Sequence, residues 1–273
     1  MKLKTAIQEF LFPIDSVQKI RRGYLKNKKI IISRNTQWAP ILGRWEPAMQ
    51  KIIFHCVKQG NIVYDCGANF GLHGMLFTQL IGKRGHLYNF EPLPGNCKEI
   101  EKNYRLNDIT NYSNVQKAVS NHSGITKFSV TAHATQGSLV EVNNQRQSVA
   151  TLEIEVTTLD EFIDAGNKMP DFIKMDIEGS EGDCLEGFER NIEKCYPLLV
   201  IELHNEEAGI KVGTFLKKHN YRAYRYEGSS ILKFEEIKKL DQSWRVADGI
   251  WGNIFCISPR HSIDLIKDLS NGL

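Results

Sequence analysis

The chain has 273 residues, 41% of them hydrophobic, which is enough to bury one substantial core. Its apolar runs fall short of the 18 or more residues that a membrane-spanning helix needs, and its six cysteines contain no C-x-x-C pair, so a membrane span, a zinc ribbon and a disulfide framework are not indicated. The formal net charge is +3, but residues 1–34 alone hold nine Lys and Arg against Glu9 and Asp15.

This uneven charge suggests how the chain is divided. We expect a basic arm or cap over residues 1–46, one α/β domain over 47–260 and a short C-terminal tail over 261–273. A basic arm suits an anionic surface such as lipid, nucleic acid or a charged glycan, although a solvated basic face explains the charge equally well. Because Glu9 interrupts the first apolar run, the start differs from a secretory signal, and we expect a soluble, cytoplasmic protein.

The first half of the domain alternates between helix and strand patterns. Residues 49–57 have the spacing of a buried helix face, and the apolar run 62–64 predicts a strand that is followed by a helix over 72–80. A second strand ends at Glu91, a second helix begins at Pro94, and 114–120 is interpreted as a third strand. This alternation predicts a parallel sheet with helices on both faces.

The second half contains an insertion and then returns to the same pattern. Segments between residues 120 and 158 alternate with period two, which predicts a small antiparallel β insertion. The runs "DFIKMDIEG" and "PLLVIELH" then predict two buried parallel strands, each followed by helical spacing. Two further strands, near residues 221–226 and 250–257, would close the sheet.

The turn after the first strand, "VYDCGANFGLHG", carries glycines at 67, 71 and 74. They form either a cradle for a ligand or a tight connection from strand to helix. Glu91 follows Gly67 by 24 residues at the end of the next strand, where a carboxylate binds the ribose of a nucleotide-like ligand or, alternatively, caps a helix. The nicotinamide fingerprint would need glycines at positions 67, 69 and 72, but the chain has Asn69 and Leu72, and it contains no P-loop motif.

Acidic residues follow the later strands. Because the carboxyl ends of parallel strands meet at one edge of a sheet, we expect the following residues to converge there: Asp176, Glu178, Glu181, Glu202 and His204. Like charges in such a cluster raise at least one pKa or attract a cation. A lone histidine at a strand end is usually a surface residue, but His204 has Glu202 two positions earlier on the same face.

Six motifs in a fixed order suggest a family. They are D-C-G-A-N-F-G, F-E-P-L-P-G-N, K-A-V-S-N-H-S-G, L-D-E-F, D-F-I-K-M-D-I-E-G-S-E and I-E-L-H. From about Trp45 to Ile257 the chain resembles the FkbM-type methyltransferases. The resemblance implies an S-adenosylmethionine-dependent enzyme, usually an O-methyltransferase, that acts on hydroxyls of glycans, glycolipids or secondary metabolites. It also implies a Rossmann-like class I methyltransferase fold with seven strands, the last of them antiparallel.

The resemblance assigns roles to individual residues. Asp65, Gly67, Asn69 and Gly71 would surround the methionine part of the cofactor, and Trp45 and Glu46 would close over it. Glu91, followed by Pro92, would hold the ribose hydroxyls, and Ala118 and Val119 would flank the adenine. Asp176 would face the methionine amine or the incoming nucleophile. Cys66 and His73 depart from the family's usual residues, which leaves cofactor binding intact but alters the expected shape of the pocket.

Catalysis is assigned to Asp176, Glu202 and His204, because a hydroxyl acceptor must lose its proton as the methyl group arrives. His204, oriented by Glu202, is one candidate base and Asp176 is the other. Alternatively, Mg²⁺ held by Asp176, Glu178 and Glu202 would acidify the hydroxyl.

The acceptor is expected to contact Trp45, Ser138 and Glu178. The insertion between residues 120 and 158 would form part of its pocket, because the polar side chains of Gln136, Ser138, Asn143 and Asn144 suit sugar hydroxyls, or it would be a purely structural flap.

Three other functions are alternatives to this interpretation. A nicotinamide-dependent oxidoreductase shares the fold but would need the missing glycines. Nucleic-acid methylation is disfavoured, since the strand that ends in D-I-E-G lacks an aromatic residue to stack on a flipped base. A non-catalytic glycan-binding domain is the third. We therefore expect a small-molecule or glycan acceptor and no specific nucleic acid, while the sequence assigns neither the acceptor itself nor an oligomeric state.

Overall fold

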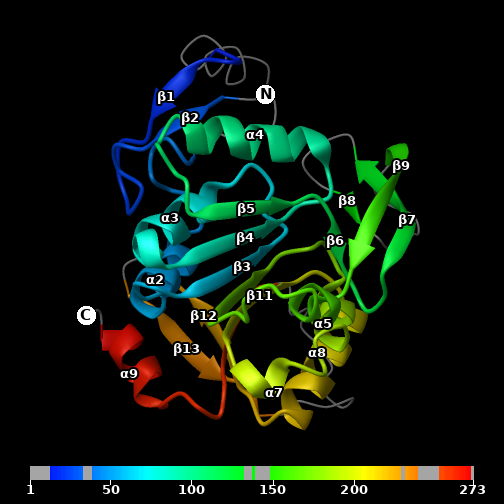
Figure 1. Cartoon of the computed structure of the whole chain (residues 1–273). Helices are drawn as coiled ribbons and strands as arrows, with labels where there is room; N and C mark the ends of the chain where they lie inside the picture. The colour runs from blue at the N-terminus through cyan, green and yellow to red at the C-terminus, as the bar shows by residue number, and fades with distance from the viewer. Residues whose placement is uncertain are drawn as a thin grey trace.

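The computed structural model describes residues 13–32, 39–131, 137–138, 148–228, 231–238 and 252–271. Its centre is one sheet with the strand order β13-β12-β14-β11-β10-β3-β4-β5. In chain order these strands are β3 (Ile62–Cys66), β4 (His86–Phe90), β5 (Tyr112–Val115), β10 (Phe172–Met175), β11 (Leu198–Leu203), β12 (Arg222–Glu227), β13 (Lys233–Glu236) and β14 (Gly252–Ile257). Figure 1 shows β3, β4 and β5 side by side in the middle of the molecule.

Seven of these strands form the expected class I arrangement. Neighbours from β5 to β11 are parallel, and β14 pairs antiparallel with both β11 and β12. The prediction of a mostly parallel sheet whose last strand is antiparallel is therefore confirmed. An eighth strand, β13, was not expected and pairs antiparallel with β12 at the edge of the sheet. Its sequence, KFEE, is largely exposed and carries no alternating apolar pattern.

Helices cover both faces of the sheet. Those on one side include α2 (Pro47–Cys56), α3 (Leu72–Ile81) and α4 (Pro94–Arg105), and those on the other are α5 (Leu159–Asp164), α6 (Glu181–Glu186), α7 (Ile192–Cys195) and α8 (Glu206–Lys218). Successive strand residues enter opposite cores: Val63 packs with the first group and Tyr64 with the second. This period of two explains why the buried strands are apolar throughout.

The insertion forms a second sheet of four strands in the order β6-β9-β7-β8. They are β6 (Ala118–Val119), β7 (Gly124–Thr131), β8 (Gly137–Ser138) and β9 (Ser148–Thr157). The insertion is not wholly antiparallel, because β6 runs parallel to β9. The single strand expected over 114–120 was also wrong, since a hydrogen bond from Lys117 N–H to the Val115 carbonyl turns the chain out of the central sheet. Residues 132–136 and 139–147, and the side chain of Ser138, lie outside the description, so the roles expected of Gln136, Ser138, Asn143 and Asn144 stay predictions.

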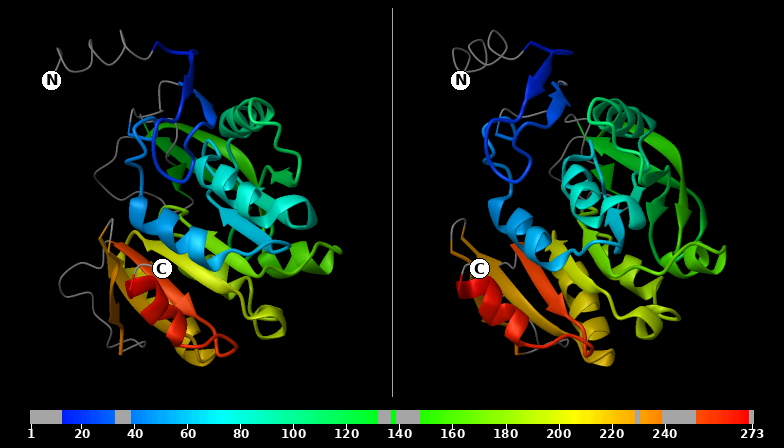
Figure 2. Two further views of the ribbon diagram at one scale, coloured as in Figure 1. Left: turned by 90° about the vertical axis from the view of Figure 1, so that its left-hand side faces the viewer. Right: turned by 60° about the vertical axis from the view of Figure 1, so that its left-hand side comes forward.

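The described part of the basic arm packs on the domain. It forms a hairpin of β1 (Val17–Lys19) and β2 (Lys29–Ile31), and Ile20 and Ile30 are buried in the core that contains α4. Figure 2 shows this hairpin, in dark blue, at one end of the molecule, and α9 (Asp264–Asn271) near the other. Among the described residues, no helix is both long and apolar enough to cross a membrane. Residues 1–12 lie outside the description, and the proposal that the arm contacts an anionic surface stays a prediction.

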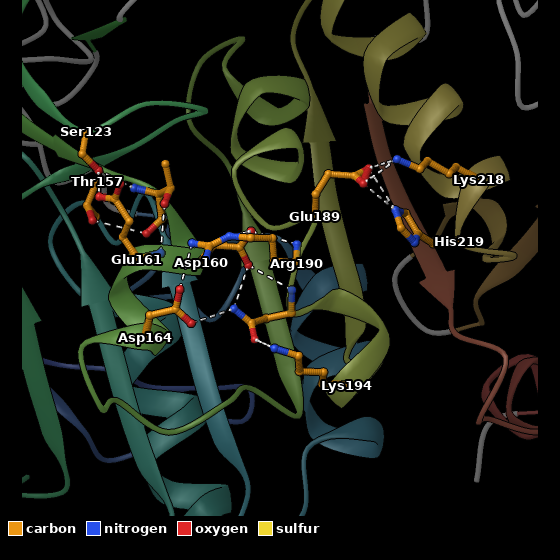
Figure 3. A network of polar contacts seen from close by, with 12 residues as sticks. Ser123, Thr157, Asp160, Glu161, Asp164, Glu189, Arg190, Lys194, Lys218 and His219 are labelled. Atoms are coloured by element: carbon orange, nitrogen blue, oxygen red, sulfur yellow. Dashed lines mark hydrogen bonds and ion pairs between the residues drawn. The ribbon is translucent and has the colours of Figure 1, made fainter.

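A polar network fixes the helices on the second face (Figure 3). The buried carboxylate of Asp160 on α5 accepts hydrogen bonds from the backbone N–H groups of Arg190 and Asn191, at 2.8 and 3.0 Å. Glu189, directly before Arg190 in the chain, bonds both Lys218 and His219 at the end of α8. These hydrogen bonds tie the loop between α6 and α7 to α5 and to α8. They thereby fix the position of α6, which contributes to the site described next.

Candidate functional site

The glycines after β3 make room for other parts of the protein. Gly67 and Gly71 have φ values of 81° and 82°, in the left-handed region. A Cβ on Gly67 would lie 1.9 Å from the carbonyl oxygen of Asp176, and a Cβ on Gly74 would lie 1.7 Å from the hydroxyl oxygen of Tyr104. Of the two alternatives, the close connection from strand to helix therefore accounts for these glycines. The ligand space lies beside the loop.

Replacing Gly67 by alanine should therefore destabilise the fold even without a ligand. Gly60 is the matched control, because its φ is 91° and a Cβ there would meet nothing within 4 Å. Both variants carry the strain of positive φ, so their difference isolates the clash with Asp176. We expect Gly67→Ala to lower the free energy of unfolding by about 1 to 3 kcal/mol more than Gly60→Ala, measured by urea denaturation. Equal losses would show that the end of β10 moves aside freely.

A cavity opens at the carboxyl edge of the sheet, between this loop and the second sheet. It encloses about 600 Å³ of empty space, including its open mouth. The residues that line it are Gly67, Asn69, Phe90, Glu91, Pro92, Leu93, Ala118, Val119, Phe128, Asp176, Ile177, Glu178 and Ser180. Its mixture of apolar walls with a few polar groups is typical of small-molecule and cofactor sites. Six of the nine residues expected to bind the cofactor lie on its wall.

Glu91 sits in this wall as a held carboxylate. One of its oxygens accepts a hydrogen bond from Asn69 N–H at 2.9 Å, and the other accepts one from Leu93 N–H at 3.0 Å. Burial raises its pKa, the two backbone bonds oppose the rise, and the resulting pKa is about 7. Glu91 thus fixes the glycine loop and the start of α4 at once, while each oxygen keeps a lone pair for a further donor.

Asp65 and Gly71 do not line the cavity. Gly71 faces the ring of Tyr104, and Asp65 is fully buried below the loop, where one oxygen lies 3.2 Å from Nζ of Lys174. Lys174 also donates to the carbonyl of Gly67 at 2.8 Å and lies 3.5 Å from Asp176. Burial alone lowers the pKa of Lys174, but the charges of Asp65 and Asp176 outweigh burial and raise it above its ordinary value.

Lys174 is a residue of the site that was not predicted from the sequence. Its one signal was a lysine among apolar residues in a buried strand. Ser180 was missed too, although it follows directly in the D-I-E-G-S motif. Its hydroxyl is buried at the cavity and has no hydrogen-bond partner among the described residues.

Trp45 and Glu46 lie against the start of α3 and outside the cavity wall. The Trp45 ring is 4.1 Å from the His73 ring, and one oxygen of Glu46 is 3.3 Å from Nε2 of His73. Burial and the charge of Asp176 raise the pKa of Glu46 to about 8, while burial holds the pKa of His73 well below its usual value. The contact therefore joins two neutral groups at pH 7. His73, which departs from the family's usual residue, is thus the partner of the aromatic-acid pair.

The acidic residues at the carboxyl edge of the sheet converge around His204 as expected, but His204 bonds a different carboxylate from the one expected. Nδ1 of His204 lies 2.9 Å from Glu181, whereas Glu202 is 3.9 Å from Nε2. The expectation that Glu202 orients His204 was therefore wrong, because Glu181 reaches the ring from the first turn of α6. Burial alone lowers the pKa of His204, but the hydrogen bond to Glu181 and the charges of Glu181, Asp176 and Glu178 raise it to about 9.

The residues expected to hold Mg²⁺ lie at this same edge of the sheet. Ligand-type atoms of Asp176, Glu202 and His204 lie within 4.8 Å of one another, so His204 replaces Glu178 in the expected set. Two cations already face these carboxylates, since Lys174 lies 3.5 Å from one oxygen of Asp176 and His204 lies 3.5 Å from the other. The charge at this edge therefore does not by itself require a metal.

All six sequence motifs lie within one stretch that matches a known domain family. The methyltransferase FkbM domain matches residues 65–223. An FkbM methyltransferase structure from Methylobacillus flagellatus is 17% identical, with a TM-score of 0.48, and the alignment covers 72% of this chain but only 43% of that one. No curated protein matches the sequence.

Two further solved structures are similar at lower identity. A SAM-dependent O-methyltransferase from Thermotoga maritima is 11% identical over 94% of this chain and 72% of its own, with a TM-score of 0.43. A precorrin-6Y C5,15-methyltransferase from Geobacter metallireducens is 13% identical over 77% and 84%, also with a TM-score of 0.43. The domain match spans more than half of the sequence, from the glycine loop through the acidic edge, and on that evidence the chain belongs to the FkbM methyltransferase family.

Proposed function

We propose that the protein is an S-adenosylmethionine-dependent O-methyltransferase that acts on a hydroxyl of a glycan, glycolipid or secondary metabolite. The observation that carries this proposal is a single cavity with two chemically different ends. One end has a buried carboxylate, Glu91, and an apolar wall that includes Val119 and Phe128. The other end has Asp176 and Glu178, with His204 beside them.

The first end fits the cofactor. A ribose has two hydroxyl donors, and Glu91 has lone pairs left to accept them. The Phe128 ring offers a flat apolar face for an adenine, and Val119 adds further apolar contact. Asn69 and Ser180 each keep a buried side-chain oxygen without a hydrogen-bond partner among the described residues, and both line the cavity. When bound, S-adenosylmethionine supplies a methyl group that is already activated for transfer.

The second end would align the acceptor and take its proton. With the cofactor bound, an oxygen lone pair of the acceptor would form the new bond to the methyl carbon as the S–C bond broke with its electron pair left on sulfur, and Nε2 of His204 would take the hydroxyl proton. Holding the hydroxyl in line is worth about 7 to 11 kcal/mol, and a positioned base contributes about 10²- to 10⁴-fold more. These residues therefore supply orientation and proton removal.

The competing functions are less well supported. A nicotinamide-dependent oxidoreductase would place glycines where Asn69 and Leu72 stand, and the family match favours methyl transfer. The described basic residues of the arm are mostly exposed and do not line the cavity, so we propose no specific nucleic acid as acceptor. A glycan-binding domain without catalysis is the outcome if the cofactor fails to bind.

Glu91→Ala tests the cofactor end. The variant removes the ribose acceptor, so we expect S-adenosylmethionine to bind at least about fivefold more weakly, the equivalent of about 1 kcal/mol. Titration calorimetry measures this, and Glu101→Ala, an exposed change on α4, should bind as the unaltered protein does. Unchanged affinity in a folded Glu91→Ala protein would refute the assignment. Mass spectrometry of candidate acceptors incubated with enzyme and cofactor would then detect the added methyl group.

A further inference from the structure

Glu181 is a buried carboxylate that the proposed mechanism does not use. It is the first residue of α6, and its side chain has no exposed surface. One oxygen accepts from Gly179 N–H at 3.0 Å and Ile177 N–H at 3.3 Å, and the same oxygen contacts Nδ1 of His204 at 2.9 Å. Three groups from two segments of the chain thus meet at a single carboxylate oxygen. The carboxylate cannot rotate without giving up all three.

This contact decides which nitrogen of His204 is free to act. The oxygen that His204 contacts already accepts hydrogen bonds from two backbone N–H groups, so it acts as an acceptor and Nδ1 must carry the proton that it shares with Glu181. When the ring is neutral, its lone pair is therefore on Nε2. Nε2 faces Asp176 at 3.5 Å and Glu178 at 3.9 Å, and both of these residues line the cavity. The lone pair is directed to the side where an acceptor hydroxyl would arrive.

We propose that Glu181 is a positioning residue that fixes the tautomer and orientation of His204, so that Nε2 faces the acceptor hydroxyl. This inference rests on the proposed function, because it assigns Glu181 to the same methyl-transfer site. The purely structural alternative is that Glu181 only ties the turn after β10 through Ile177 and Gly179. The two roles differ in what happens to the histidine when the carboxylate is changed.

Several charged groups set the protonation of His204. Asp176 and Glu178 approach from the turn after β10, Glu181 from α6 and Glu202 from β11. Lys174 faces Asp176 from below and opposes their effect. Glu181 is the nearest of the four carboxylates, and it is the one that contacts Nδ1. Its charge should therefore have the largest single effect.

Glu181→Gln tests the inference, because glutamine keeps a carbonyl acceptor but removes the charge. We expect the pH–rate midpoint to fall by about one pH unit or more, since the imidazolium loses its closest carboxylate. The His204 midpoint in NMR titration of protein with ¹⁵N-labelled histidine should fall by the same amount. Glu181→Ala should also lose the preference for the Nδ1–H tautomer in the neutral ring. Glu186→Gln is the control on the same helix, because Glu186 bonds Asn121 instead of His204, and both midpoints should stay in place.

Two results would overturn the inference. One is an unchanged His204 midpoint and tautomer in the Glu181 variants, which NMR measures without any methyl transfer. The other is an NMR midpoint that moves while the pH–rate midpoint does not. Failure of the unaltered protein to bind S-adenosylmethionine would instead overturn the proposed function, and calorimetry detects that separately.

Discussion

Lys174→Met is expected to lower the free energy of unfolding by about 3 to 5 kcal/mol, the range for removing one partner of a buried ion pair. Methionine fills much of the same volume, so the loss comes from charge. Asp65 would keep a carboxylate that is fully buried and has no other hydrogen-bond partner among the described residues, and the Gly67 carbonyl would lose its donor. Urea denaturation of the purified variant measures the effect.

Lys117→Met is the matched control. Lys117 pairs with Glu155 at 2.9 Å, but both side chains are largely exposed, and such pairs contribute at most about 1 kcal/mol. Adding Asp65→Leu to Lys174→Met should recover part of the lost stability, because the double variant leaves no unpaired carboxylate. A loss below about 1 kcal/mol in Lys174→Met would mean that Asp65 finds water or a proton at little cost.

His204→Gln is expected to slow methyl transfer by about 10²- to 10⁴-fold, the usual contribution of a general base. Because the pKa of His204 is raised to about 9, the ring is mostly protonated at pH 7 and its basic form increases with pH. The rate of the unaltered enzyme should therefore rise about tenfold per pH unit up to about pH 9 and then level off. In the variant this rise should disappear, while cofactor affinity stays nearly the same.

His122→Gln serves as the control, because His122 is exposed and bonds only its neighbour Asn121 among the described residues. Its pH profile should match that of the unaltered enzyme. A slow His204 variant whose rate still rises with pH would point to Asp176 as the base. If added Mg²⁺ restored that variant and a chelator abolished its activity, the metal mechanism would be favoured.

The sequence predicted what depends on chain order and periodicity. Strand and helix alternation placed Glu91, Asp176 and His204 at one edge, because parallel strands bring their carboxyl ends together whatever the side-chain details. The resemblance to known methyltransferases placed Ala118 and Val119 in the same cavity. These relationships need only the order of the elements and of the motifs that carry the resemblance, so they were accessible before the structure.

Contacts between distant segments could not be predicted in the same way. Glu202 and His204 share a strand face, but the orientation of the imidazole is decided by Glu181, from a helix whose packing no local pattern encodes. Glycines in a loop after a strand indicate close approach by a ligand and by the protein itself equally well, and here Gly74 makes room for the hydroxyl of Tyr104, 30 positions later in the chain. A lysine does not fit the apolar pattern of a buried strand, so no role could be predicted for Lys174. Its burial there depends on Asp65, which lies opposite it on the neighbouring strand.

Two asparagines that face the N-terminal hairpin, Asn103 on α4 and Asn107 just after it, have an effect on association between molecules. Asn103 accepts from Ile31 N–H, and Asn107 both accepts from Lys29 N–H and donates to the Lys29 carbonyl. These are the hydrogen bonds that a neighbouring strand would otherwise make along the outer edge of β2. The side-chain amides of α4 and of the turn after it thus occupy that edge, and at Lys29 and Ile31 the hairpin offers no template onto which a second chain could add a strand and begin to aggregate.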